Sequence, residues 1–388
     1  MRELQLKTLT SLSDVSAEAW NAVANPPGLP FDPFLSWEFL EALEASGAAT
    51  PETGWSPLHM IIESPEDGLL AAMPLYAKTH SRGEFIFDQS WADAYERAGG
   101  QYYPKLLNAI PFTPVTGRRQ FIHPYHPDQD GLKNALIAGA IQLTQDNDLS
   151  SVHFNFLEQA DYTAFGDLGL LQRTDQQFHF ENKGYESFDD FLSELTSAKR
   201  KNLRKERKKA QDGLTFKWLT GDDITAQDWD YFFDFYMDTG SRKWGYPYLN
   251  RNTFELLHDR LREHILLVFA CDGDEPIAGA LNMIGSETLY GRYWGRSEER
   301  PFLHFEVCYY QAIDFAIEKG LKRVEAGAQG GHKLARGYGP ETIYSAHWIG
   351  HEGLRHAVDQ YLAQEREAVS QEQTYLAQRQ PFKKGEPT

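Results

Sequence analysis

Apolar residues recur along this chain at two different spacings, which predict interleaved helices and strands. Intervals of three and four residues indicate amphipathic helices, whereas alternation and short apolar runs indicate strands. In the first half, the pattern predicts helices over Ser16–Asn25, Trp37–Ser46 and Leu132–Asp146, and strands over Leu58–Glu63, Leu69–Lys78, Ser151–Phe156 and Phe178–Phe180. The first two strands are expected to pair through the turn Ser64–Gly68, and Ser151–Phe156 is expected to be half-buried.

The second half of the chain has a similar order of elements. The pattern predicts helices over Phe188–Ala210, Asp228–Thr239, Arg251–Glu263 and Leu303–Lys319, and strands over Thr215–Leu219, Ile265–Cys271, Ile277–Ile284, Thr288–Trp294, Leu321–Glu325 and Ile343–Trp348. We therefore expect an α/β (α+β) protein with two domains, residues 1–180 and 181–350, each a mixed sheet flanked by helices. Residues 351–388 are expected to add a polar helix and a disordered end, Pro381–Thr388.

Composition narrows the class of protein. Its 388 residues suffice for a substantial core, and an aromatic content of 13% excludes a disordered chain. The net charge of -18 argues against broad, nonspecific binding to nucleic acid or anionic membranes, although it leaves room for a local basic site. Two cysteines give neither a disulfide framework nor metal-ligand spacing, and no metal site is expected. Without a signal peptide or a membrane-spanning stretch, a cytoplasmic location is expected.

The segment Gly327–Pro340 combines five glycines and a proline with His332, Lys333 and Arg336. It follows a predicted strand, and its glycines argue against regular structure. A glycine-rich turn of this kind lets the backbone approach an anionic or carbonyl-bearing ligand. A surface loop with solvated charges is the alternative interpretation.

Several further segments carry a family resemblance. They are Tyr76–Phe85, Tyr102–Leu106, Pro111–Val115, Arg242–Gly245, Leu303–Gln311 and Gly331–Tyr338. With these segments the chain resembles the FemAB-like family of N-acyltransferases, also described as peptidoglycan biosynthesis or recognition proteins. The resemblance implies two GNAT-like domains in tandem, as in the Fem peptidyltransferases.

The resemblance also implies roles in acyl transfer. In Fem-type enzymes a lysine in the loop after this strand stabilises the tetrahedral intermediate, and Lys333 holds that place here, with Arg336 as a second cation. Glu306 and His304, at the start of the preceding helix, are candidates for a general base or an amine-binding group, and Glu325 is a further candidate base. For Glu306, a favourable contact with the helix dipole is the alternative. Gln329 and His332 are assigned to substrate binding.

One turn departs from the pattern of CoA-dependent GNAT enzymes. Such enzymes hold the CoA pyrophosphate in a glycine-rich turn, whereas Arg296–Phe302 has no glycine and contains Glu298 and Glu299. Carboxylates repel a pyrophosphate. Acyl-CoA is therefore considered as a co-substrate only, and no permanently bound cofactor is expected.

A basic run, Lys199–Lys209, stands out in this acidic chain. At helical spacing Arg200, Arg204 and Arg207 share a face, which suits phosphates of a nucleotide-linked substrate or of RNA. A solvated helix that pairs with acidic neighbours is the alternative. Fem-type enzymes carry a comparable helix, but this chain has no space for the helical-hairpin insertion of many tRNA-dependent members. A tRNA partner is therefore the second choice.

The first domain contributes a group of polar and aromatic residues. Those assigned to substrate binding are Lys78, Ser81, Glu84, Tyr102, Tyr103 and Lys105, together with Lys243 and Trp244 of the second domain. The tyrosines flank Pro104, a cluster more typical of a binding surface than of a core. We interpret it as a wall on the substrate side, with a structural loop between domains as the alternative.

Two classes of function follow. In the first, the protein transfers an acyl group from an activated donor, a CoA thioester or an aminoacyl-tRNA, to an amine of a small molecule, cell-wall precursor or peptide. In the second, it binds such a precursor without chemistry. The cations and carboxylates favour an enzyme, whereas the altered turn favours a binding protein or an unusual donor. The sequence does not decide the oligomeric state.

Overall fold

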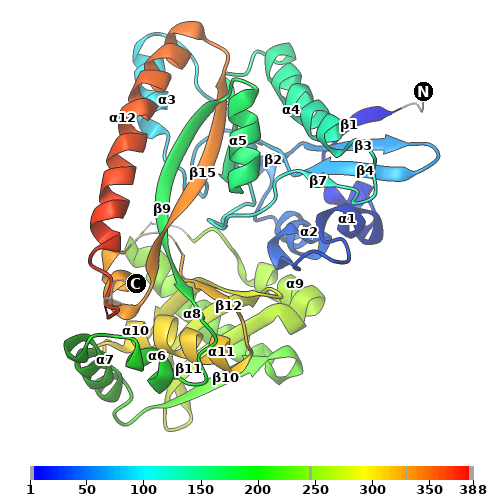
Figure 1. Ribbon diagram of the computed structural model, residues 1–388. Coiled ribbons are helices and arrows are strands. Elements are labelled where there is room, and N and C mark those ends of the chain that lie inside the picture. The colour runs from blue at the N-terminus through cyan, green and yellow to red at the C-terminus, as the bar shows by residue number, and fades with distance from the viewer. Residues whose placement is uncertain (1–3, 244–246, 328–329, 384–388) are drawn as a thin grey trace. The chain divides into compact units, whose positions relative to one another are not determined.

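The computed structural model describes residues 4–243, 247–327 and 330–383 (Figure 1). The chain divides into two compact units. The first unit comprises Met1–Leu29, Phe34–Asp175 and Thr342–Gln371, and the second comprises Pro30–Pro33, Gln176–Glu341 and Glu372–Thr388. This division differs from the expected ranges 1–180, 181–350 and 351–388, because the chain returns to the first unit after residue 341 and adds a strand and most of the last helix to it.

The first unit contains a small antiparallel sheet with the strand order β1-β3-β4-β7. Its strands are β1 (Gln5–Leu9), β3 (His59–Ser64), β4 (Gly68–Met73) and β7 (Phe121–Ile122). The accompanying helices are α1 (Ala17–Ala24), α2 (Trp37–Ala45), α3 (Gln89–Arg97), α4 (Gln129–Asp146) and α5 (Gln159–Asp167). Ser16 and Ser36 cap α1 and α2, because each hydroxyl accepts a hydrogen bond from the third residue beyond it.

A second set of strands in this unit follows the order β15-β8-β6-β5-β2. They are β2 (Trp55–Pro57), β5 (Tyr76–Lys78), β6 (Lys105–Asn108), β8 (Ser151–Leu157) and β15 (Gly339–Ile349). The main core lies between α4 and these strands, where Leu136 and Ala140 belong to one cluster with Phe154. A smaller cluster joins the last helix, α12 (Glu352–Ala377), to Trp91 of α3.

One strand prediction and one burial prediction for this unit are wrong. Leu69–Lys78 is not one strand, because Pro74 cannot donate a ladder hydrogen bond and the chain leaves β4 before it enters β5 in the other sheet. Ser151–Phe156 does form a strand, β8, but all seven of its residues are buried rather than one face. In its antiparallel pairing with β15, His153 lies opposite His347.

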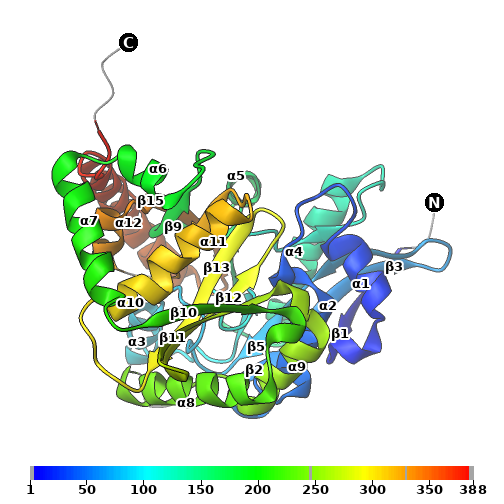
Figure 2. The same cartoon turned by 90° about the horizontal axis from the view of Figure 1, so that it is seen from below.

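In the second unit the strand order is β10-β11-β12-β13-β14-β9. The strands are β9 (Leu171–Glu181), β10 (Thr215–Thr220), β11 (Ile265–Asp272), β12 (Glu275–Ile284), β13 (Thr288–Arg296) and β14 (Arg323–Glu325). β11 and β12, both predicted as strands, form an antiparallel hairpin, while β13 and β14 are parallel. α8 (Ala226–Lys243) and α11 (Gln311–Glu318) cover opposite faces of this sheet (Figure 2). Consecutive residues of β13 point to the two sides, since Tyr293 contacts Tyr236 of α8 and Trp294 contacts His304 in the short helix α10 (Leu303–Phe305), which precedes α11.

The predicted helix Phe188–Ala210 is interrupted. Its two parts are α6 (Phe188–Ser193) and α7 (Ser197–Ala210), and Leu195 between them makes a bridge to Phe382. The same bridge shows that Pro381–Lys383, expected to be disordered, is ordered. The remaining helix of the unit, α9 (Arg251–Leu261), matches its prediction. None of the helices in the described ranges is both long and apolar enough to cross a bilayer.

Candidate functional site

Lys333 lies in the second unit on a short 3-10 helix, Gly331–Arg336, rather than in an irregular loop. Gly330 and Gly337 flank this helix with φ angles of 112° and 90°, which glycine adopts without strain. The Lys333 side chain turns inward and is 2% exposed. Its Nζ donates to the carbonyl oxygens of Ala326 (2.8 Å) and Gly327 (2.7 Å), immediately beyond β14. Burial lowers the pKa of this amine to about 8.

Glu325 is the last residue of β14 and pairs with Tyr290 of β13. It is 5% exposed, and burial, reinforced by the charge of Asp32, raises its pKa to about 8. Among the described residues Oε2 accepts no hydrogen bond, although His179 Nε2 lies 3.9 Å away. Lys333 Nζ is thus bonded to the backbone of the two residues that follow Glu325, but the two side chains form no hydrogen bond or ion pair with each other.

Glu325→Gln is expected to stabilise the protein at neutral and alkaline pH. The carboxyl titrates near pH 4.5 in the unfolded chain and near pH 8 when folded. Because folding raises the pKa of Glu325, the wild-type protein is most stable below the unfolded pKa and loses stability as the pH rises through the folded pKa. The Glu325→Gln variant has no such loss. The gain over wild type should therefore grow by about 3–4 kcal/mol between about pH 5 and pH 8, at about 1.4 kcal/mol per pH unit. Denaturant unfolding at both pH values measures it.

Glu318→Gln is the matched control, since Glu318 is exposed on the same unit and, among the described residues, forms an ion pair with neighbouring Lys319 alone. A surface change of this kind should alter stability by about 0.5 kcal/mol or less at either pH. An equal gain for Glu325→Gln at both pH values would show that burial does not oppose ionisation of Glu325.

Glu306 is held in a different set of contacts. It begins a π-helical turn, Glu306–Tyr310, that joins α10 (Leu303–Phe305) to α11. Its Oε1 accepts hydrogen bonds from Gln311 (2.7 Å), Gln211 (2.9 Å) and Arg207 (3.2 Å). The side chain is fully buried, and burial raises its pKa despite the opposing charge of Arg207. Glu306 therefore connects the C-terminal end of α7 to the helix of the π turn through hydrogen bonds. These contacts go beyond the favourable interaction with a helix dipole that was the alternative interpretation.

Arg336 is also part of an inward-facing group. It is 6% exposed, forms an ion pair with Glu206 at 2.8 Å, and its guanidinium lies 3.4 Å from the centre of the Phe305 ring. Tyr310 donates to the same Glu206 carboxylate. The expectation of a cation directed at an anionic ligand is therefore corrected for Arg336, since its charge is already neutralised by Glu206.

His304 and His332 lie near each other, with ring centres 6.2 Å apart. His332 Nε2 is 3.0 Å from the hydroxyl of Tyr309, and His304 stacks at 4.3 Å on Trp294 of β13. The helix that begins at Leu303 thus places His304 beside the 3-10 helix of Lys333, while Glu306 points toward α7.

The turn Arg296–Phe302 has an acidic partner for each arginine. Arg300 contacts Asp272 (2.6 Å) and Glu298 (3.0 Å), and Arg296 contacts Glu299 at 3.4 Å. These carboxylates form ion pairs with the two arginines that would otherwise bind a pyrophosphate. The turn therefore does not fit a glycine-rich pyrophosphate cradle.

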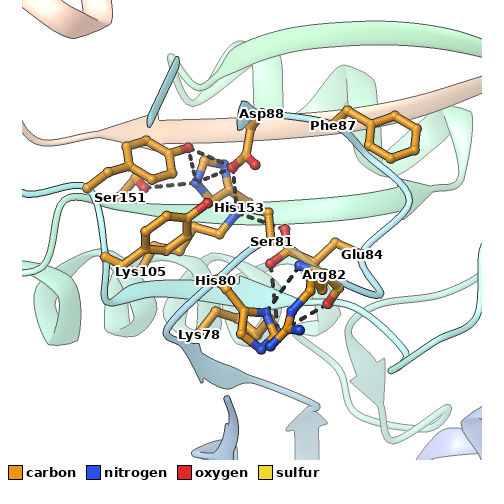
Figure 3. A network of polar contacts seen from close by, with 12 residues as sticks. Lys78, His80, Ser81, Arg82, Glu84, Phe87, Asp88, Lys105, Ser151 and His153 are labelled. Atoms are coloured by element: carbon orange, nitrogen blue, oxygen red, sulfur yellow. Dashed lines mark hydrogen bonds and ion pairs between the residues drawn. The ribbon is translucent and has the colours of Figure 1, made fainter. Parts of the chain in front are cut away.

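The first unit contains a separate, buried ionic network around Lys105 (Figure 3). Lys105 Nζ bonds to Glu84 Oε2 (2.7 Å), Ser81 Oγ (2.9 Å) and the carboxylate of Asp88. Tyr102 donates to Asp88 at 2.7 Å. The network reaches partial exposure at Tyr103, whose hydroxyl is 2.8 Å from Ser81 Oγ.

Burial and neighbouring charges shift the pKa values of the network in two ways. The pKa values of Glu84 and Lys78 move toward the form without charge, whereas those of Asp88 and Lys105 move toward the charged form. Burial raises the pKa of Glu84 to about 7 and lowers that of Lys78 to about 7. Burial also opposes ionisation of Asp88 and Lys105, but their mutual attraction outweighs it, so the pKa of Asp88 is lowered and that of Lys105 is raised. Lys78 lies 3.7 Å above the Trp55 ring and donates to Gly54 O at 3.1 Å.

The expected binding surface in this unit is wrong in one respect. Lys78, Tyr102 and Lys105 are completely buried, and Glu84 and Ser81 are nearly so. The sequence pattern suggested exposure because charged and tyrosine side chains flank a proline, but their partners bury them. Only Tyr103 retains the half-exposed position of a surface contact.

The other expected residues are distributed as follows. Arg204 is exposed on α7 and pairs with Asp189 at 2.8 Å, and Arg200 is half-buried on the same helix. Arg207 leaves their face to bind Glu306 and Asp314. Lys243 ends α8, but its side chain lies outside the described part, as do Trp244 and Gln329. In the described ranges no three His, Cys, Asp or Glu side chains are grouped to hold a metal ion.

Several residues that build these sites were not predicted. Asp88 carried no sequence signal, because its partner Lys105 is distant in the chain. Arg207 was expected on a phosphate-binding face rather than at Glu306. His153 and His347 lie in predicted strands, but neither was assigned a role. Their Nδ1 atoms lie 2.7 Å apart, and burial lowers the pKa of His153 to about 3.

Solved structures with a similar fold include FemX, at 13% sequence identity over 89% of this chain and 98% of its own, with a TM-score of 0.54. Another is the C-terminal domain of a putative lysylphosphatidylglycerol synthetase from Agrobacterium fabrum, at 10% identity over 90% and 97%, also with a TM-score of 0.54. A tandem GNAT protein from the clavulanic acid biosynthesis pathway matches at 10% identity over 90% and 98%, with a TM-score of 0.46. The expected α/β fold is confirmed, since the two structures with TM-scores of 0.54 share it over most of the chain.

No curated protein matches the sequence. The family model of FemAB-like proteins, described as peptidoglycan biosynthesis/recognition, matches residues 11–384. The match covers almost the whole chain and contains every candidate residue described above. This chain therefore belongs to the FemAB-like family.

Proposed function

We propose that the protein is an N-acyltransferase that moves an acyl group from an activated donor to an amine, with a peptidoglycan precursor or peptide as acceptor. Two observations carry the proposal: a buried lysine held by backbone carbonyls just beyond β14, and a buried carboxyl on the last residue of that strand. Lys333 and Glu325 are both inward-facing, and both have pKa values of about 8.

Acyl transfer to an amine creates negative charge on the carbonyl oxygen. A fixed donor in a water-poor site stabilises that charge. An ammonium group has three N–H donors, and Lys333 uses two of them on Ala326 and Gly327. These bonds fix the position of Nζ and, within the described residues, leave its third donor for a substrate oxygen.

The acceptor amine must lose a proton before or during attack. A base works best when its pKa is close to the working pH. Glu325 has such a pKa, and its Oε2 accepts no hydrogen bond from the described residues. In this mechanism Glu325 takes the proton from the amine nitrogen while Lys333 holds the developing oxyanion.

A second candidate has the same chemistry with a different donor. It is favoured by the turn Arg296–Phe302, where Asp272, Glu298 and Glu299 neutralise both arginines. Such a turn is poorly suited to the pyrophosphate of CoA, so the donor in this case is an aminoacyl-tRNA. Binding of a cell-wall precursor without chemistry is the remaining interpretation, and the following experiment separates the three.

We expect one class of donor and one class of acceptor to raise the melting temperature of the protein. Binding to the folded state stabilises it by about 2.7 kcal/mol at a ligand concentration one hundred times Kd. Thermal-shift measurements with acetyl-CoA, longer acyl-CoAs, aminoacyl-tRNA and UDP-linked precursors test this. The stabilising donor and acceptor are then combined and the acylated product is measured by mass spectrometry.

Each outcome separates the candidates. Stabilisation by an acyl-CoA and formation of acylated amine support the CoA-dependent reaction. Product formed only with aminoacyl-tRNA supports the second candidate. Stabilisation by a precursor without product from any donor contradicts the enzyme and leaves the binding protein.

A further inference from the structure

One face of α7 carries an unusual concentration of positive charge. Successive residues of a helix are about 100° apart, so half of the circumference of α7 is covered by cations. We call this the basic face; it consists of Arg200, Lys201, Arg204, Lys205, Lys208 and Lys209. No acidic residue lies within that half of the helix. The chain as a whole has a net charge of -18, so the basic face is a local exception.

The opposite side of α7 fixes the direction of the basic face. Leu203 and Ala210 are buried in the core of the second unit. Arg207 is held by Glu306 and Asp314 and lies 4.2 Å from the Phe188 ring centre. These contacts prevent rotation of the helix, so the remaining cations point outward. α7 lies at the edge of the ribbon in both views (Figures 1 and 2).

Most of the basic face lacks an acidic partner among the described residues. Arg204 pairs with Asp189, but both side chains are more than half exposed, and such pairs contribute little. The four lysines form no ion pair with any described residue and are exposed. Lys209 lies 5.9 Å from the ring centre of Phe302, a partly exposed aromatic residue. Unpaired cations attract anions, and the exposed aromatic ring beside them can contact apolar groups such as lipid acyl chains.

From these features we infer that the basic face docks the protein on a bilayer with anionic headgroups. The helix is about 20 Å long, at 1.5 Å per residue, so its cations are spread too far apart for a single phosphate. An extended anionic surface matches this spread, and clusters of four to eight basic residues on a helix suit it.

An RNA partner fits the same face less well. No aromatic side chain lies among the six cations, so bases have no ring on which to stack. Four of the six are lysines, whose ammonium groups neutralise charge without the paired hydrogen bonds that arginine makes to phosphate. Phe302 at the margin suits the boundary between headgroups and acyl chains, where amphipathic surfaces bind. The inference is independent of the proposed reaction, because it needs no substrate.

The test is co-sedimentation of the full-length protein with vesicles. We expect binding to a mixture of phosphatidylglycerol and phosphatidylcholine, none to phosphatidylcholine alone, and loss of binding at high salt. A variant with Lys201→Gln, Lys205→Gln and Lys208→Gln should bind about one hundredfold more weakly, since each basic residue contributes about fivefold. Thermal unfolding confirms that the variant is folded.

The matched control removes three lysines elsewhere in the second unit, with Lys217→Gln, Lys319→Gln and Lys322→Gln. All three are exposed, and the change in net charge is the same. This control should bind vesicles within a fewfold of wild type. The inference is overturned if both variants lose binding equally, if the wild type does not bind anionic vesicles, or if it binds labelled tRNA and not the vesicles.

Discussion

Lys333→Met is expected to lower kcat by about two to three orders of magnitude, the usual cost of removing one oxyanion donor. The reason is that Nζ is a buried cation held by the carbonyl oxygens just beyond β14, and methionine keeps the volume of the side chain without its charge. The assay uses the donor and acceptor that stabilise the protein. Steady-state kinetics should show the loss in kcat rather than in KM, because the interaction forms in the transition state.

Three further measurements make the first prediction specific. Lys322→Met removes an exposed lysine close to β14 in sequence, which pairs with Glu287, and should leave kcat unchanged. For the wild type, kcat/KM should rise toward about pH 8 as Glu325 ionises and fall above it as Lys333 loses its proton. Full activity of a folded Lys333→Met variant would restrict Lys333 to holding the backbone at Ala326 and Gly327.

Lys105→Met is expected to destabilise the protein by about 3–5 kcal/mol, the effect of breaking a buried ion pair. Lys105 is completely buried and is the cation shared by Glu84 and Asp88. Without it, two buried carboxylates remain close together with only Lys78, 4.0 Å from Glu84, as a described cation beside them, and protonation of a carboxylate relieves the repulsion. Urea unfolding at neutral pH measures the loss, which should shrink toward acidic pH.

Two variants provide the comparison for Lys105→Met: one removes a surface lysine, and the other removes the charges of the network together. Lys7→Met breaks a partly exposed pair with Glu63 in the same unit, and should cost about 1 kcal/mol or less. Combining Lys105→Met with Glu84→Gln and Asp88→Asn should recover much of the lost stability, because the two carboxylates that Lys105 neutralised are then uncharged. If Lys105→Met costs no more than Lys7→Met, the network does not hold the first unit together.

Local patterns predicted most of the elements because the periodicity of a helix or strand depends on neighbouring residues. The helix α4 and the hairpin of β11 and β12 follow directly from the spacing of their apolar residues. The interruption between α6 and α7 was not predictable in this way. It depends on Phe382, almost two hundred residues further along the chain, which pairs with Leu195.

The candidate site was predictable only where one segment carries most of it. Glycines on either side of His332 and Lys333 pointed to a functional segment from local sequence alone. Burial of Lys105 was not predictable, since charged residues are normally exposed and Asp88, its partner, lies 17 residues away. Arg336 was misjudged for the same reason, because Glu206 lies 130 residues away.

The return of β15 to the first unit has a consequence for biosynthesis. β8 is buried along its whole length in the finished protein, and its pairing with β15 joins residues such as His153 and His347, which are 194 positions apart. At ordinary translation rates that distance takes roughly 10 to 40 seconds to synthesise. During this interval the nascent chain presents an apolar strand with one edge open, the kind of surface that chaperones shield. The unit that is synthesised first is therefore the one whose sheet is completed last.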